Sequence, residues 1–459
     1  MNRKLLRFDF RCRSLSLVAL VLCFATAASA GWNEKVLYSF QSIPDGAYPA
    51  GGVVFDKSGN LYGATTFGGR NDTGYCFGLP QCGTVYQVRR PVQKGKPWTE
   101  TVLYAFKGVN HNDGNNPEGG VLLDKDGNVY GTTAYGGAGK CQLFGSRVGC
   151  GIVFELTPPA RKGGAWTETI LYSFQNANDG YIPVGSLVSD ALGNLYGATL
   201  FGGGKGTNCD SYYGGNCGTV FELSPPRQKG GKWKEKVLYS FTGGSDGGQP
   251  NGGLVLDSKG TIYGTTYYGG NESGRCAGVG GSVGCGTVFA VRPPNKKGAE
   301  WTQRVLHRFD IEHAYPAAGV ILGPSGELYG TTTWSPNGNG LVFELKKPAK
   351  GSHTWTENVL HQFTGGFEGS DPVAALLLGA HGDLYGTTYL PGGAVFRLRP
   401  KGGKWTFNTL YGFEGLSSGA EPRAGVILDR LGNIYGTTEY GGNGPCGYAA
   451  CGVVFEVSP

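Results

Sequence analysis

The sequence predicts an all-β fold, a single seven-bladed β-propeller with four antiparallel strands in each blade. A segment of the form "GNLYGATTFGG" recurs seven times along the chain. Each repeat holds four strand-like segments separated by Gly- and Pro-rich turns, and no segment has a helical period. Repeats of this length with four strands are typical of propeller blades. The repeats start near Trp32, Trp98, Trp166, Trp233, Trp301, Trp355 and Trp405.

Residues 1–30 have the physical features of a secretory signal peptide. Basic residues between positions 3 and 13 precede a short apolar stretch at 15–26, and Ala28-Ser29-Ala30 supplies a small-residue cleavage site. The apolar stretch is too short to span a bilayer as a helix. We therefore expect a mature chain of residues 31–459, one closed propeller domain without a membrane span, that is secreted or lies in the periplasm or at the cell surface.

Removal of this segment changes the charge of the chain. The whole chain holds 40 Lys and Arg against 34 Asp and Glu, and the first thirty residues hold five basic residues and one acidic residue. The remaining chain has 35 basic and 33 acidic residues, a net charge of +2. The basic balance typical of nucleic-acid-binding domains is lost, so no nucleic-acid partner is predicted.

The second repeat shows the order of the four strands. "WTETVLYAF" (98–106) alternates in polarity, "EGGVLLD" (118–124) is short and apolar, and "VYGTTAY" (129–135) and "GIVFEL" (151–156) complete the blade. In a propeller the "EGGVLLD" segment lines the central channel, so the tryptophan strand lies outermost. The N-terminal "WNEKVLYSF" then lacks inner strands and the C-terminal "CGVVFEV" lacks an outer one. We expect these two strands to pair and to close the ring.

In the recurring segment a glycine directly follows a tyrosine. Because side chains alternate along a strand, Tyr62 and Gly63 point to opposite faces of the blade. Glycine in a strand marks a close approach, so we expect a bulky side chain of the neighbouring blade over Gly63 and its equivalents. We interpret the segment as a packing and turning unit without a chemical role.

Ten of the twelve cysteines form five close pairs, each at the same place in a different repeat. Pairs in register in an exported protein predict local disulfides. Histidine does not accompany any pair, which argues against zinc. The predicted pairs are Cys76–Cys82, Cys141–Cys150, Cys209–Cys217, Cys276–Cys285 and Cys446–Cys451.

The pattern "G-x-[LIV]-Y-G-T-T-x-x-G-G…G-x-V-F-x-L" resembles the bacterial GloVer (Gloeo-Verruco) tandem-repeat family over essentially the whole mature chain. The resemblance implies an exported bacterial protein, with no settled activity and no catalytic residues to carry over. Members often carry a sorting or anchoring device at one end. This chain stops at "FEVSP" after its last strand, so the resemblance suggests a soluble exported form.

A polar residue stands four positions before a proline in the loop after each outer strand. Under the expected strand order these side chains ring the channel mouth, as a site for a cation or for sugar hydroxyls. The alternative is that they form tight turns by bonding their own backbone. His313, beside Glu312, is the only histidine expected to face the mouth. The candidate ligand-binding residues are Asp45, Asp113, Asp179, Asp246, Glu312, His313, Glu368 and Ser418.

The sequence contains no G-x-S-x-G, H-E-x-x-H, phosphate-loop or EF-hand motif. We therefore predict no catalytic residue, no metal and no cofactor. The "PPxxKGG" hairpins carry basic side chains at the opposite end of the blades. We interpret them as solvated turns, and an acidic polysaccharide ligand is the alternative.

Three functions remain open. The first is an exported, monomeric, non-catalytic binding or scaffold propeller that contacts a glycan or a protein at the cell surface. The second is an enzyme acting on an extracellular carbohydrate or lactone, with Glu312, His313 and neighbouring mouth carboxylates as acid and base. The third is a structural envelope component. Repeat symmetry and the missing catalytic motifs favour the first, whereas a deep channel pocket with converging, unequal carboxylates would favour the second.

Overall fold

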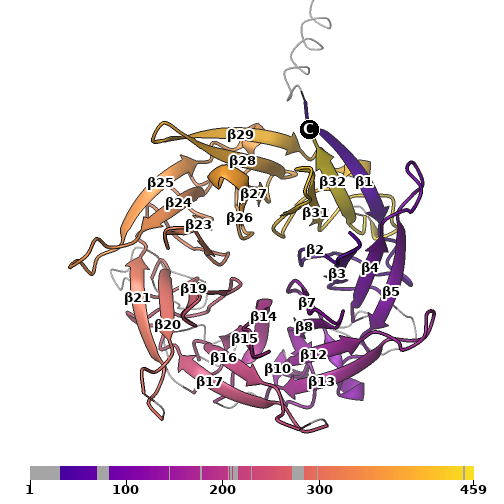
Figure 1. Ribbon diagram of the computed structural model, residues 1–459, viewed down its shortest axis with the longest axis horizontal. Helices are drawn as coiled ribbons and strands as arrows, with labels where there is room; N and C mark the ends of the chain where they lie inside the picture. The colour runs from indigo at the N-terminus through magenta and orange to yellow at the C-terminus, as the bar shows by residue number, and fades with distance from the viewer. Residues whose placement is uncertain are drawn as a thin grey trace, which may run out of the picture.

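Seven four-stranded antiparallel sheets surround a central opening (Figure 1), which confirms the predicted seven-bladed propeller. The computed structural model describes residues 31–69, 82–143, 145–175, 178–204, 206, 209, 216–228, 230–270, 276, 284–296, 298–447 and 450–459. The predicted signal peptide (1–30) and Cys76 lie outside these residues. In the described ranges, no helix is long and apolar enough to cross a membrane.

Each blade runs outward from the channel in the order that the sequence predicts, with the tryptophan strand outermost. Blade 1 is β2 (Val54–Phe55), β3 (Leu61–Thr65), β4 (Thr84–Arg89) and β5 (Thr99–Ala105). Blade 2 is β7 (Leu122–Leu123), β8 (Val129–Thr133), β12 (Ile152–Thr157) and β13 (Thr167–Ser173). Blade 3 is β14 (Tyr181–Ser189), β15 (Leu195–Phe201), β16 (Thr219–Ser224) and β17 (Lys234–Ser240). Blade 4 is β18 (Val255–Leu256), β19 (Ile262–Thr266), β20 (Thr287–Arg292) and β21 (Thr302–Arg308).

The remaining blades repeat this order, and the last one combines both ends of the chain. Blade 5 is β22 (Ile321–Leu322), β23 (Leu328–Thr332), β24 (Leu341–Lys346) and β25 (Thr356–Gln362). Blade 6 is β26 (Leu377–Leu378), β27 (Leu384–Thr388), β28 (Ala394–Lys401) and β29 (Lys404–Gly412). Blade 7 is β30 (Ile427–Leu428), β31 (Ile434–Thr438), β32 (Val453–Ser458) and β1 (Asn33–Ser39). β1 pairs antiparallel with β32, from Asn33 opposite Ser458 to Ser39 opposite Val453.

Short elements decorate the loops. The strand pairs are β6 (Gly114–Asn115) with β9 (Tyr135–Gly136), and β10 (Gln142–Leu143) with β11 (Ser146–Arg147). The 3-10 helices are η1 (Val109–His111), η4 (Gly366–Glu368), η5 (Ala380–Gly382) and η6 (Leu416–Ser418).

The side chain over each recurring glycine comes from the same blade, so the expectation of a neighbouring blade was wrong. Phe154 of β12 stands directly opposite Gly131 of β8, and a Cβ added to Gly131 would lie 2.6 Å from Phe154 Cζ. The other pairs are Gly63–Tyr86, Gly197–Phe221, Gly264–Phe289, Gly330–Phe343, Gly386–Phe396 and Gly436–Phe455.

The neighbouring blade contributes the next layer of this packing. Phe106, at the end of β5 in blade 1, meets the Phe154 ring edge-on, with 5.2 Å between ring centroids. An equivalent aromatic pair occurs at every one of the seven blade junctions. Edge-to-face pairs of this kind contribute about 0.5–1.5 kcal/mol each beyond the apolar area that they bury. The recurring glycine therefore makes room for the aromatic core between blades.

Four of the five predicted disulfides are bonded: Cys141–Cys150, Cys209–Cys217, Cys276–Cys285 and Cys446–Cys451. The fifth pair includes Cys76, which is outside the described residues. The second cysteine of a pair directly precedes the third strand of its blade, as Cys150 precedes β12 (Ile152–Thr157). The disulfides therefore staple the loop between the second and third strands.

Candidate ligand site in the central channel

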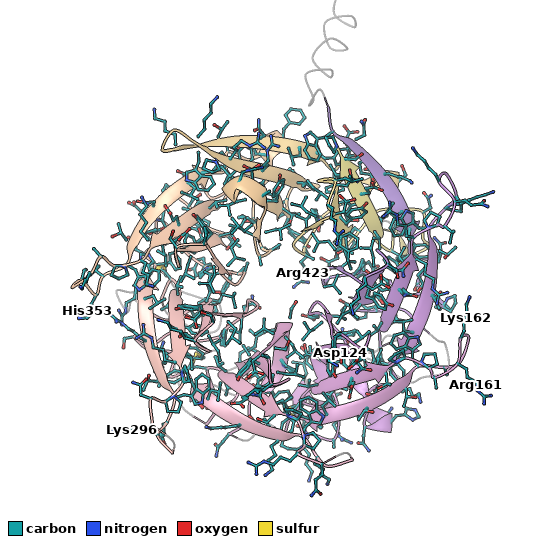
Figure 2. All side chains as sticks on the ribbon, in the orientation of Figure 1. Asp124, Arg161, Lys162, Lys296, His353 and Arg423 are labelled. Atoms are coloured by element: carbon teal, nitrogen blue, oxygen red, sulfur yellow. A yellow bond between two sulfur atoms is a disulfide. The ribbon has the colours of Figure 1, made fainter. Side chains whose placement is uncertain are left out.

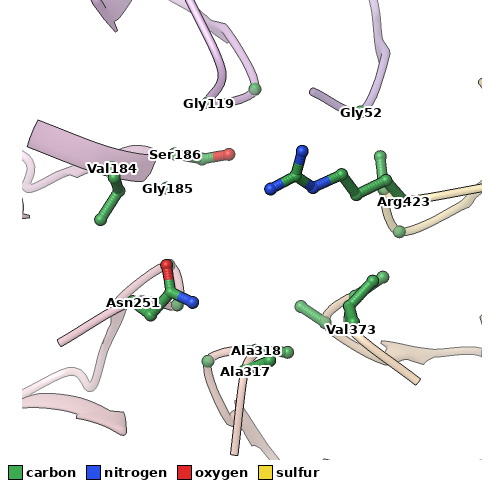
Figure 3. Close-up of a pocket in the computed structure, with 18 of the residues that line it drawn as sticks. Gly52, Gly119, Val184, Gly185, Ser186, Asn251, Ala317, Ala318, Val373 and Arg423 are labelled. Atoms are coloured by element: carbon green, nitrogen blue, oxygen red, sulfur yellow. The ribbon is translucent and has the colours of Figure 1, made fainter. Parts of the chain in front are cut away.

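A cavity of about 730 Å³ occupies the central channel (Figure 3). Its wall consists mainly of the three residues that follow a repeated proline in each blade, just before the innermost strand or, in blade 3, within it. These segments are 50–52, 118–120, 184–186, 251–253, 317–319, 373–375 and 423–425. We call this space the channel cavity.

Glycine lets these wall segments approach one another. A Cβ added to Gly51 would lie 2.5 Å from the carbonyl oxygen of Gly119 in the next blade. The first threonine of the recurring segment then ties the second strand of one blade to the wall of the next. Thr265 Oγ1 donates to Ala318 O at 2.7 Å, and Thr387 and Thr437 make the equivalent bonds to Ala424 O and Gly51 O. Thr331 Oγ1 instead donates to the carbonyl of Pro372, directly before the wall segment of blade 6. The wall is thus a nearly symmetric ring of backbone.

The residue before each repeated proline has a left-handed backbone. Its φ lies between 54° and 62° in all seven blades, at Tyr48, Asn116, Ile182, Gln249, Tyr315, Asp371 and Glu421. Non-glycine residues adopt this region at a cost of about 1–3 kcal/mol each. The backbone N–H of this residue bonds the carbonyl of the preceding blade, as in Ile182 N–H to Cys150 O at 3.1 Å. Ring closure between blades therefore holds this backbone in place.

The side chains on the wall break the symmetry. The first wall residue differs from blade to blade, as Ala50, Glu118, Val184, Asn251, Ala317, Val373 and Arg423. Asp371 and the rings of Tyr267 and Tyr389 also line the cavity. In Figure 3 the Arg423 guanidinium points from blade 7 into the open centre. The charged lining side chains are thus Glu118, Asp371 and Arg423.

One ionic cluster surrounds Arg423. Arg423 Nη1 lies 3.9 Å from Glu439 Oε1, and Tyr389 Oη donates to Glu439 Oε2 at 3.2 Å. Burial raises the pKa of Glu439; Arg423 and Tyr389 oppose this rise, and Glu421 adds to it. Burial likewise raises the pKa of Glu118, with Arg423 lowering it and Glu439 raising it further. Arg423 therefore lowers the pKa of both carboxyls, which lie in different surroundings.

Two tyrosines line the cavity, Tyr267 on the side of blade 4 and Tyr389 on the side of blade 6. Tyr267 and Tyr315 stack with their ring centroids 5.3 Å apart. Burial, with a smaller contribution from the charge of Asp371, raises the pKa of the Tyr267 hydroxyl. Leu390, which follows the second strand of blade 6, also lines the cavity and is among the exposed large apolar residues. The cavity combines flat apolar faces with a few charged groups, an arrangement typical of small-ligand sites.

The carboxylates predicted to ring the mouth are absent from the described lining of the channel cavity. Asp113 is buried and accepts hydrogen bonds from Tyr104 Oη at 2.9 Å and from the Lys107 N–H at 2.8 Å. Asp45, Asp179 and Asp246 accept the same tyrosine and backbone bonds in their own blades. Burial raises the pKa of Asp113. These contacts are those of the turn alternative.

The candidates His313, Glu368 and Ser418 are also held by protein groups. His313 Nδ1 lies 3.1 Å from Glu357 Oε1, and His307 Nε2 lies 3.1 Å from Glu357 Oε2. Glu368 lies 3.2 Å from His361 Nε2, and the Ser418 hydroxyl donates to Gly415 O. Glu312 is exposed. Among the residues described as lining the channel cavity, none of the eight predicted ligand residues occurs; ligand binding by these residues remains a prediction.

Sequence reasoning missed Glu118, Asp371 and Arg423. The sequence does contain an indication of these residues. The residues on either side of the repeated proline differ from repeat to repeat, whereas the surrounding residues recur. Glu312 was predicted as a ligand residue because it falls in the recurring turn. Variation within a repeat marks the channel better than recurrence does.

No group of three or more His, Cys, Asp and Glu residues in the described ranges is arranged to hold a metal ion. The basic hairpin residues Arg161, Lys162 and Lys296 lie at the outer rim, far from Arg423 in the centre (Figure 2). Their side chains are exposed, as expected for solvated turns.

A family model described as Gloeobacter/Verrucomicrobia repeat matches residues 23–277 and 275–459. No curated protein matches the chain. Solved propellers with some likeness include a putative 6-phosphogluconolactonase from Bacteroides fragilis NCTC 9343, at 16% identity over 79% of this chain and 86% of that chain, with a TM-score of 0.47. The PQQ-bound aldose sugar dehydrogenase from Streptomyces coelicolor is 14% identical over 94% of this chain and 99% of that chain, with a TM-score of 0.42. Likeness at this level says nothing about what this chain binds.

Proposed function

The chain belongs to the Gloeobacter/Verrucomicrobia repeat family, and we propose that it is an exported, monomeric, non-catalytic glycan-binding propeller whose ligand enters the channel cavity. The observation that carries the proposal is the combination of a cavity of about 730 Å³ with tyrosine faces and three charged side chains from different blades. Sugar rings present both apolar faces and hydroxyls, so a ligand of this class matches both parts of the wall.

Export is part of the proposal. The four bonded disulfides fit a protein that folds in an oxidising compartment. The expected signal peptide at residues 1–30 has the charge and apolar pattern of such segments. The ligand is then a polysaccharide or glycan that the protein meets outside the cytoplasm.

The test is a glycan array probed with the protein, followed by calorimetric titration of each hit. We expect a restricted set of oligosaccharides to bind with micromolar to millimolar Kd. Uniform lack of binding across the array would contradict the proposal.

A second candidate, a carbohydrate- or lactone-active enzyme, is favoured by one observation. Glu118 and Glu439 experience the same Arg423 in different surroundings, and pairs of carboxyls in unequal environments are used for acid and base roles. Prolonged incubation with each bound glycan distinguishes the two functions. Intact sugar supports binding alone, and new reducing ends that disappear in Glu118→Gln support the enzyme.

A further inference from the structure

The acidic groups of the channel cavity exceed its basic groups. Among the described residues, Glu118 from blade 2 and Asp371 from the loop before β26 line the cavity together with a single cation, Arg423. Arg423 approaches Glu439 to 3.9 Å, so its charge is already shared with a carboxylate. In the part of the chain that the structure describes, no cation forms an ion pair with Glu118 or Asp371.

These two carboxylates also lack hydrogen-bond donors from the protein. No described residue donates a hydrogen bond to the side chain of Glu118 or Asp371. Burial raises the pKa of both groups. Both side chains are half-buried, and a carboxylate that is partly removed from water without a counter-ion is stabilised by a partner that brings its own positive charge.

The aromatic wall suits the same partner. Tyr267 lies close enough to Asp371 for the carboxylate charge to raise the pKa of its hydroxyl, after the larger effect of burial. Tyr389 lines the cavity near Glu439. Aromatic faces beside carboxylates attract ammonium groups by adding a cation–π contribution to the ion pair. A neutral sugar uses the faces but not the excess charge, and an acidic sugar is repelled by it.

We propose that the channel cavity selects an oligosaccharide of amino sugars with free ammonium groups, one of which pairs with Glu118 beside blade 2 and another with Asp371 beside blade 6. This inference rests on the proposed glycan-binding function and specifies the chemical class of the glycan.

The experiment compares three tetrasaccharides of matched length by calorimetric titration at low ionic strength. They are β-linked glucosamine, its fully N-acetylated counterpart and a uronic acid. At about pH 6, an amine of this kind carries its charge. We expect the glucosamine tetrasaccharide to bind about tenfold or more tightly than the acetylated one, as for a charge-assisted hydrogen bond in place of a neutral one.

Variants of the two carboxylates test whether they cause the preference for the charged sugar. Glu118→Gln and Asp371→Asn should each weaken glucosamine binding towards that of the acetylated sugar, and leave the acetylated sugar unchanged. The control, Asp126→Asn, removes an exposed carboxylate of the same blade that is paired with Lys125 outside the cavity, and should change neither affinity.

The outcomes separate the inference from the proposed function. Equal binding of the charged and acetylated sugars, or tightest binding of the uronic acid with loss in Arg423→Gln, overturns the inference and leaves glycan binding in place. Absence of binding by all three sugars and by the glycan array overturns both.

Discussion

Each residue of the recurring Tyr-Gly-Thr-Thr segment has a separate structural role. In blade 2, Tyr130 Oη bonds Glu155 Oε1 at 2.9 Å, and Gly131 makes room for Phe154. Thr133 Oγ1 bonds Tyr135 O at 2.7 Å and turns the chain out of the strand. The first threonine ties successive blades in blades 4 to 7. The segment is thus explained by packing and needs no chemical role.

The pairing of Gly131 with Phe154 can be tested by a double-mutant cycle. Gly131→Ala should lower the free energy of unfolding by about 1–3 kcal/mol, because the new methyl overpacks against the Phe154 ring. In a Phe154→Leu background the same change should cost clearly less. The control is Gly412→Ala, at a strand glycine with open space around it, which should be neutral. Equal costs in both backgrounds, measured by urea unfolding, would contradict the same-blade contact.

At the scale of elements, the outer strands carry buried carboxyls that face the loop of the preceding blade. Burial and the charge of Asp45 raise the pKa of Glu100 in β5 to about 8. Glu168 and Glu235, at the same place in β13 and β17, are raised to about 7, mainly by burial. In β21 the position holds Gln303, whose amide donates to Asp246 O at 3.2 Å. The protonated acid and the amide are interchangeable here.

The sign of the pH effect follows from these shifts. Glu100 holds its proton in the folded state up to about pH 8, whereas in the unfolded chain it ionises near 4.5. The folded protein binds more protons between these values, so this group makes stability fall as pH rises through that window. Glu100→Gln should therefore match the wild type at about pH 4 and exceed it by on the order of 1 kcal/mol at about pH 8.

Thermal unfolding across this pH range provides the measurement. Glu357→Gln serves as the matched contrast, because hydrogen bonds from His307 and His313 outweigh burial and lower the pKa of Glu357 to about 2. That variant should lose stability at neutral pH. A Glu100→Gln variant with the same pH profile as the wild type would contradict the buried, protonated carboxyl.

The disulfides belong to the loops more than to the ring. Ile182 N–H bonds Cys150 O across the blade junction, and the equivalent bond in blades without cysteines runs from Asp371 N–H to Asn339 O and from Glu421 N–H to Gly392 O. The junction therefore forms without a disulfide, and the chain-entropy model gives a loop this short only about 2–3 kcal/mol per bond.

Reduction should accordingly leave the propeller folded. Arg147, inside the Cys141–Cys150 loop, is held by bonds to the carbonyls of Gly137, Ala138 and Gly139. We expect faster tryptic cleavage after Arg147 once the disulfide is reduced, with the circular dichroism of the strands unchanged. Global unfolding on reduction would show that the staples support the ring itself.

For the whole molecule, ring closure depends on β1. This strand supplies the outer edge of blade 7 by pairing with β32, and Phe40 meets Tyr86 of blade 1 at 4.9 Å between ring centroids. Deletion of residues 31–42 should expose the edge of β32 and remove one of the seven aromatic junctions. We expect a large fall in melting temperature or failure to fold. A truncated protein that melts like the full chain would contradict closure by β1.

The blade number, the strand order and the cysteine pairs could be predicted because the same pattern of residues occurs in several repeats. Each repeat supports the same assignment independently. The channel could not be predicted in the same way. Glu118 and Arg423 lie 305 positions apart in the sequence and line the same cavity only because the ring places blades 2 and 7 around one centre. The tyrosine partners of Asp45 and Asp113 were missed because they lie on the preceding outer strand.

The central claim is that ligand occupies the channel cavity, and a plug tests it most directly. Val373→Trp places an indole on the cavity wall, while the control Val92→Trp adds the same ring to a fully exposed hairpin position. Calorimetric titration with the best oligosaccharide from the array should show binding to the Val92→Trp variant with the wild-type Kd and a loss of at least about tenfold, or about 1.4 kcal/mol, in Val373→Trp at equal melting temperature. Undiminished binding by a folded Val373→Trp protein would place the ligand elsewhere on the molecule and contradict the account.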